Sequence, residues 1–278
     1  MYNTPISHDS IYNILELFIN KSSKDKSQLQ LDNFINKAIE NNDYSFSTGL
    51  LGAGWLVAYL HQMEILTDDI DELLFDFDDN FYKIAINAIV VESTTLCETL
   101  EIINYFQQRI QNRQIKFNFY RRFVLFEIIK LLNEKLVNMI SLKSLIISDS
   151  VKILLKFSYL IKTFINEKDL GNVFYSKTEE LILHFQNKKI FDNTDLENIY
   201  ILLIACIQFG NPHWVKTIRN LLPKVNNSSE SLLSFLRMIV QLMIQDSKRA
   251  KIGFKDLKSD INSYHLGFIV TNLKGISV

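Results

Sequence analysis

The chain has 278 residues, of which 30 are basic and 31 acidic, giving a formal charge of −1. No global electrostatic field therefore attracts it to nucleic acid or to an anionic membrane. Its only cysteines, Cys97 and Cys206, form no Cys-x-x-Cys motif, and the first residues carry no secretory signal. These features predict a cytoplasmic protein that binds no nucleic acid.

Apolar residues recur at intervals of three and four along most of the chain, which is the period of one helix face. Only 8 glycines and 3 prolines are present, and the Asn-Gly and Asp-Gly dipeptides typical of β-hairpins do not occur. The pattern predicts an all-α chain of roughly twelve helices. Its polar connectors are all short, which favours a single domain over residues 1–278.

The first strongly apolar segment, FSTGLLGAGWLVAYL at residues 46–60, contains three glycines. Each glycine inside a helix costs about 0.5 to 1 kcal/mol relative to alanine. Either these glycines let another helix approach closely, or they leave the backbone open to a central cavity. The wholly apolar part spans only about 12 residues, which is too short for a membrane span. We expect a helix that other helices enclose.

A later long helix, over residues 118–139, is predicted to be half-buried. Its apolar side chains share one face, whereas its basic side chains fall mainly elsewhere. The members of the apolar face are Leu125, Ile128, Ile129, Leu132 and Leu136.

Four later helices are also predicted to be amphipathic, at residues 148–166, 173–187, 211–222 and 229–245. In contrast, IYILLIACIQF at 199–209 is apolar on nearly every side, like residues 49–60. This alternation predicts an inner set of helices enclosed by an outer set, as in helical hairpins arranged in a ring or a solenoid. Thr194 or Asp195 is the expected N-cap of the helix that contains Tyr200.

Two segments resemble the lanthionine synthetase C-like family. The order Phe46-Ser47-Thr48-Gly49-Leu50-Leu51-Gly52-Ala53-Gly54-Trp55-Leu56, with the acidic stretch that follows it, is similar to the family's first glycine-rich motif. The segment FDNTDLENIYILLIACIQFGNPHWVKTIRNLL at 191–222 is similar to a second family element, with Tyr200 and Trp214 at matching places. The resemblance implies an α/α toroid of helical hairpins, closed or incomplete, with inner and outer helix layers.

The family's zinc site is not preserved in this sequence. Family cyclases hold zinc through two cysteines and one histidine, and the zinc activates a cysteine thiol of the peptide substrate. Asp192 stands where the family has a cysteine, and residues 225–231, VNNSSES, contain neither cysteine nor histidine. A single carboxylate does not hold zinc. The resemblance therefore implies a pseudo-cyclase without metal or cofactor.

We expect such a protein to act as a non-catalytic component of ribosomal peptide maturation that binds a precursor peptide or a peptide-modifying enzyme. The side chains expected to line its binding surface are Phe46, Trp55, Tyr59, Asp192, Asp195, Tyr200 and Trp214.

Two alternatives remain open. One is an active enzyme with displaced chemistry, either a thioether cyclase that uses Cys97 or Cys206 or a metal-free lyase. The other is a helical-repeat adaptor for protein interactions. The paired carboxylates Asp68-Asp69, Asp71-Glu72 and Asp78-Asp79 are expected to form a solvated helix face.

Overall fold

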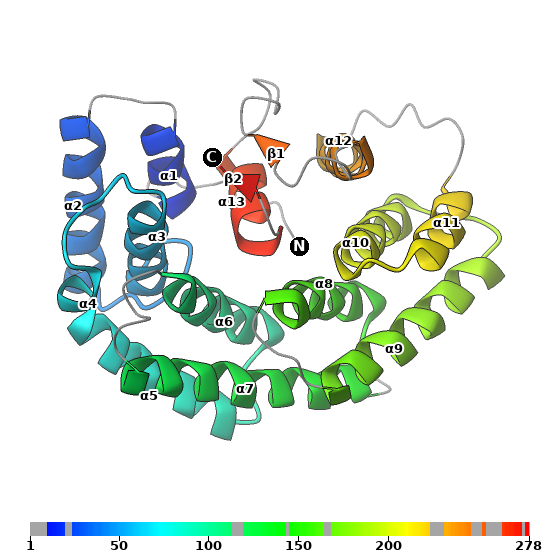
Figure 1. Cartoon of the computed structure of the whole chain (residues 1–278), viewed down its shortest axis with the longest axis horizontal. Coiled ribbons are helices and arrows are strands. Elements are labelled where there is room, and N and C mark those ends of the chain that lie inside the picture. Colours follow the sequence, from blue (N-terminus) through cyan, green and yellow to red (C-terminus); the bar gives the residue numbers. More distant parts are fainter. Residues whose placement is uncertain are drawn as a thin grey trace. The chain divides into compact units, whose positions relative to one another are not determined.

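A computed structural model describes residues 10–19, 24–112, 119–142, 145–163, 168–222, 231–245, 252–253, 263–273 and 276–277. These residues are helical apart from turns and a parallel pair of two-residue strands, β1 (Ile252–Gly253) and β2 (Ile276–Ser277). The prediction of an all-α chain is confirmed. The chain divides into two compact units, Met1–Leu136 and Val137–Val278, coloured blue to green and green to red in Figure 1. The single domain over residues 1–278 stays a prediction.

The first unit is built around one apolar helix, α3. Its described helices are α1 (Ile11–Ile19), α2 (Lys24–Glu40), α3 (Leu50–Gln62), α4 (Ile70–Leu73), α5 (Phe75–Val90), α6 (Leu96–Gln111) and the first part of α7 (Phe119–Ser141). Helix α3 contacts α1, α2, α4, α5 and α6, and nine of its side chains or glycines are buried. The prediction that residues 49–60 form an enclosed helix is confirmed, because other helices of the unit cover α3 on several sides.

The glycines of α3 allow close packing. A Cβ atom on Gly52 would lie 1.7 Å from the carbonyl oxygen of Phe46, in the segment that leads into the helix. A Cβ atom on Gly54 would lie 2.8 Å from the ring of Tyr105 on α6 and 3.0 Å from the ring of Phe81 on α5. Neither approach leaves room for a side chain. These contacts support close helix approach, the first of the two reasons expected from the sequence.

The apolar face predicted for the long helix is also confirmed. Its five members, which lie on the part of α7 that belongs to the first unit, are at most 3% exposed. They are Leu125, Ile128, Ile129, Leu132 and Leu136.

The second unit has its own central helix, α10. The described helices here are α8 (Ile147–Thr163), α9 (Lys168–Asn187), α10 (Asn193–Phe209), α11 (Pro212–Leu221), α12 (Ser231–Gln245) and α13 (Ser263–Asn272). Helix α10 contacts α8, α11 and α12, while α9 contacts α8 and α11. Residues 202–206 of α10 are all buried, which confirms that the second strongly apolar segment is enclosed.

The start of α10 differs from the sequence prediction. Neither Thr194 nor Asp195 is the N-cap; Asp192 is. The Asp192 carboxylate accepts a hydrogen bond from the Asp195 backbone N–H at 2.8 Å, and the Asp195 carboxylate accepts one from the Asp192 N–H at 3.0 Å. This reciprocal capping box satisfies two backbone donors that the first turn leaves open.

No helix among the described residues combines the length and the hydropathy that crossing a bilayer requires.

Candidate functional site

The candidate site begins at the sharp corner between α10 and α11. Helix α10 ends at Gly210, whose φ of 84° and ψ of 34° place it in the left-handed region that glycine adopts without strain. The Asn211 side chain then caps α11 by accepting hydrogen bonds from the backbone N–H groups of His213 and Trp214, at 3.1 and 3.3 Å. Pro212 occupies the first turn of α11, where its fixed φ suits a helix start. The sequence Gly-Asn-Pro thus closes one helix and opens the next.

Trp214 anchors α11 to the unit. It is 1% exposed, and its ring centroid lies 4.8 Å from that of Tyr175, 5.7 Å from that of Phe209 and 6.0 Å from that of Phe174. Its indole N–H donates a hydrogen bond to the Glu179 carboxylate. This aromatic contact with α9 and α10 fixes which face of α11 points outward.

The outward face of α11 forms one side of a groove. Its residues follow the spacing i, i+3, i+4, i+7 and i+8, so they share one face of the helix. They are Pro212, Val215, Lys216, Arg219 and Asn220. The lining is completed by Ile207 of α10, its C-cap Gly210, the turn residue Asn211, and Met243 and Ile244 of α12. These ten residues define the α10–α12 groove, a cavity of about 790 Å³.

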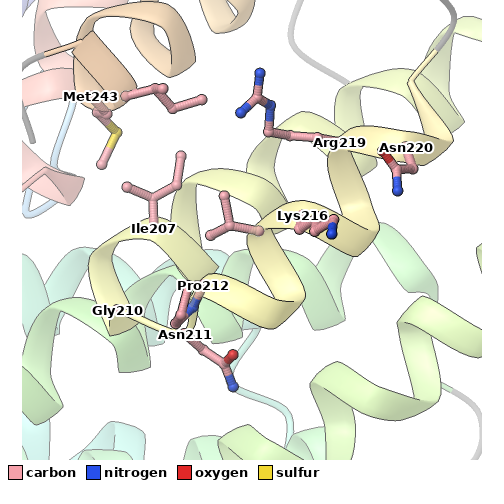
Figure 2. Close-up of a pocket in the computed structure, with 10 residues that line it drawn as sticks. Ile207, Gly210, Asn211, Pro212, Lys216, Arg219, Asn220 and Met243 are labelled. Atoms are coloured by element: carbon pink, nitrogen blue, oxygen red, sulfur yellow. The ribbon is translucent and has the colours of Figure 1, made fainter.

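The α10–α12 groove combines an apolar floor with a basic edge. Figure 2 shows Met243 of α12 pointing toward Ile207 of α10, while Arg219 of α11 extends into the space between α11 and α12. The described residues that line the groove include two bases, Lys216 and Arg219, and no acid. Helices α11 and α12 contain no Asp or Glu in their sequences. The groove can therefore pair with carboxylates while it accepts aliphatic side chains.

Three of the side chains predicted to line a binding surface lie together in the first unit. The ring centroids of Phe46 and Trp55 are 5.4 Å apart, and the Trp55 ring stacks on that of Tyr59 at 5.5 Å. All three are at most 6% exposed. They therefore pack the core of this unit, and a part for them in binding stays a prediction.

The other four predicted residues belong to the second unit. Asp192 and Asp195 form the capping box of α10, and the Asp195 carboxylate also pairs with Lys188. Burial opposes ionisation of Asp195, but Lys188 and the Asp192 N–H outweigh it and hold the pKa of its carboxyl below its usual value. The Tyr200 hydroxyl accepts a hydrogen bond from Arg237 Nε at 3.3 Å. The fourth residue, Trp214, lies in the first turn of α11, next to the groove, but its ring packs into the core of the unit.

The two cysteines lie in different environments. Cys206 is fully buried in α10, and desolvation raises the pKa of its thiol well above the usual value, with a further contribution from Glu179. Cys97 is exposed near the start of α6 and donates a hydrogen bond to Glu101 Oε1 at 3.5 Å. Burial of Cys206 disfavours the thiolate that a nucleophile requires.

No group of three or more His, Cys, Asp or Glu side chains in the described part of the chain could hold a metal ion. Most of the family's second ligand window, residues 225–230, lies outside the described residues.

One expectation about the carboxylate pairs is wrong. Asp78 does not face solvent: it is 6% exposed and accepts two hydrogen bonds from Arg109, at 3.0 and 2.7 Å. The signal was present in the sequence, because Asp78 shares a helix face with Phe81 and Ala85, three and seven residues further on. Its face therefore points inward, and Arg109 compensates the buried charge.

Sequence reasoning also missed the residues of the groove. Lys216, Arg219 and Met243 carried no motif that singled them out. The spacing of Val215, Lys216 and Arg219 on α11 could have suggested a shared face, but not the position of α12 opposite it.

No family model, curated protein or solved structure matches this chain. What the described residues define is an all-helical protein whose second unit carries an apolar groove with a basic edge.

Proposed function

We propose that the chain is a cytoplasmic, non-catalytic peptide-binding protein that acts in ribosomal peptide maturation. The observation that carries the proposal is the α10–α12 groove, in which Ile207 and Met243 offer apolar contact beside the bases Lys216 and Arg219. Its proposed occupant is a peptide segment that presents aliphatic and acidic side chains. The resemblance of residues 46–56 and 191–222 to lanthionine synthetase C-like sequences supports the biological setting.

The groove offers two kinds of favourable interaction. Complete burial of one leucine side chain against its floor would contribute about 1.5 to 3 kcal/mol. A carboxylate that pairs with an exposed base at its edge would contribute at most about 1 kcal/mol, and salt would weaken it. The apolar contact therefore supplies most of the affinity, whereas the bases select the charge of the peptide.

The environment of Asp192 and Cys206 supports a role without catalysis. Asp192 stands where the resemblance places a zinc-ligating cysteine, and its carboxylate is used to cap α10. Cys206 is enclosed in the core, where desolvation disfavours its thiolate. Incubation with a dehydrated precursor peptide tests this part of the proposal. Unchanged thioether formation supports a binding role, and accelerated formation would establish a cyclase instead.

We also propose that the helices of the whole chain form an α/α toroid. The support is the alternation of enclosed and amphipathic helices, with α3 and α10 as the enclosed members. Small-angle X-ray scattering distinguishes the arrangements. A compact toroid of this length has a radius of gyration near that of a single globular domain, about 19 Å. A clearly larger radius would indicate separated units.

Selection from a random-peptide phage library tests the binding site itself. We expect the wild-type chain to enrich peptides that combine acidic and aliphatic residues. Arg219→Glu reverses a charge at the groove edge and should remove the preference for acidic residues, while aliphatic residues stay enriched. Lys189→Glu is the matched control, because Lys189 is exposed in the same unit but does not line the groove. An acidic preference that survives Arg219→Glu, or that is lost equally in both variants, would contradict the proposed site.

A further inference from the structure

The first unit contains a second groove with the opposite charge. It is a cavity of about 660 Å³ whose walls come mainly from α5 and α7. Phe75, Asp78, Asp79 and Tyr82 contribute from α5, at spacings of three, four and seven residues that place them on one helix face. Tyr120 and Arg121 contribute from α7. We call this cavity the α5–α7 groove.

A buried ionic network fixes two of the residues that line the α5–α7 groove, Asp71 and Asp78. Arg109 is fully buried on α6; it donates two hydrogen bonds to Asp78 and one, at 2.9 Å, to Asp71. The Tyr105 hydroxyl donates a third hydrogen bond to Asp78. Burial, followed by the neighbouring Asp78 charge, raises the pKa of Tyr105 well above its usual value, so the hydroxyl keeps its proton. The Asp78 carboxylate is therefore fixed in position by several donors.

The groove already accommodates one guanidinium group. The Arg121 guanidinium lies 4.9 Å from the centroid of the Phe75 ring and 3.5 Å from Asp78 Oδ2. It also donates a hydrogen bond to the Asp71 carbonyl oxygen at 3.0 Å. Stacking on an aromatic face combined with a carboxylate contact is the arrangement that arginine favours.

A second carboxylate and two further aromatic side chains are exposed in the α5–α7 groove. Asp79 is exposed and has no hydrogen-bond or ion-pair partner among the described residues. Tyr82 and Tyr120 are 42% and 76% exposed. The groove thus combines an exposed carboxylate with exposed tyrosine side chains, and both attract a cation.

We propose that the α5–α7 groove binds an arginine side chain of a partner polypeptide, with Asp79 pairing with its guanidinium and the rings of Tyr82 and Tyr120 providing cation–π contact. Arginine fits better than lysine because its planar, weakly hydrated guanidinium stacks on aromatic rings, as Arg121 does on Phe75. The α5–α7 groove and the α10–α12 groove share no lining residue, so each can be altered by its own variants.

Fluorescence anisotropy with a labelled tri-arginine peptide tests the proposal on the full chain. Asp79→Asn and Tyr82→Ala should each weaken binding by about threefold or more, the size expected for loss of one exposed cation contact. Asp76→Asn is the matched control, because Asp76 is exposed on the same helix but does not line the groove. It removes the same charge and should leave the affinity unchanged.

Two outcomes would overturn the proposal. Equal weakening by Asp76→Asn and Asp79→Asn would assign binding to the general field of an acidic helix. Binding of a tri-lysine peptide as tight as that of tri-arginine would contradict the aromatic contribution. Arg219→Glu, which alters the α10–α12 groove, should not weaken tri-arginine binding. A negative result for one of the two proposed sites can therefore be told apart from a negative result for the other. Thermal unfolding followed by circular dichroism verifies that each variant is folded.

Discussion

A buried lysine gives the second unit a defined dependence of stability on pH. Lys156 on α8 is 1% exposed, and its Nζ donates a hydrogen bond to the carbonyl oxygen of Thr271 at 2.9 Å. Burial lowers the pKa of Lys156 from 10.5 to about 7. The charged form is disfavoured because an apolar interior solvates an ammonium group poorly. In the unfolded chain the same amine regains its ordinary pKa.

The sign and size of the effect follow from these two pKa values. Between about pH 7 and 10.5 the unfolded chain binds a proton at Lys156 that the folded chain does not bind. Stability therefore falls as pH decreases through this window, and the penalty is fully present below the folded pKa. At 1.36 kcal/mol per pH unit the complete penalty is about 5 kcal/mol. Between pH 9 and pH 7 the folded chain should lose about 2 kcal/mol from this group.

Denaturant unfolding measures this loss in the intact chain. Each unit holds one of the two tryptophans, so Trp55→Phe leaves Trp214 as the fluorescent reporter of the second unit. In that background Lys156→Met should remove about 2 kcal/mol of pH dependence between pH 7 and pH 9. Lys152→Met, one turn earlier and partly exposed, is the control and should keep the dependence. Equal pH dependence in the parent and in Lys156→Met would refute the assignment to Lys156.

Two further predictions concern packing and thiol reactivity. Gly52→Ala should destabilise the first unit by about 3 kcal/mol or more, since its Cβ would meet a backbone oxygen. Gly171→Ala is the control, because its new Cβ would meet nothing within 4 Å. In thermal melts it should be neutral or stabilising by up to about 1 kcal/mol. Equal destabilisation by Gly52→Ala and Gly171→Ala would contradict the packing argument. Titration with Ellman's reagent should find one reactive thiol, Cys97, in the native protein, and a second, Cys206, only after denaturation. Two reactive thiols in the native state would show that the core opens readily.

Periodicity was sufficient to predict the helical class and the enclosed helices. Residues 49–60 and 199–209 are apolar on nearly every side, and the structure encloses α3 and α10 accordingly. The apolar face of α7 could be read in the same way, because i, i+3 and i+4 spacing specifies a helix face without knowledge of the partner.

Polar features were harder to predict, because they depend on partners distant in sequence. Asp78 lies inside the first unit only because Arg109, 31 residues later, compensates its charge. Lys156 donates to a carbonyl group 115 residues away. The Asp192 cap was missed for a local reason, since several adjacent polar residues could each have started the helix.

The α10–α12 groove could not be predicted from the sequence for the same reason. Ile207, Arg219 and Met243 come from three helices, and each is unremarkable in its own segment. The aromatic residues that drew attention in the sequence, such as Trp55 and Trp214, are core anchors. The groove became visible only once the Gly-Asn-Pro corner fixed the direction of α11 relative to α10.

Hydrogen exchange on the full chain, with and without a peptide selected from the phage library, tests the peptide-binding proposal most directly. We predict that an acidic and aliphatic peptide slows exchange at the C-terminal end of α10, in α11 and in α12, and that Arg219→Glu reduces this protection. Unchanged exchange in these three helices, or protection confined to the first unit, would contradict the proposal.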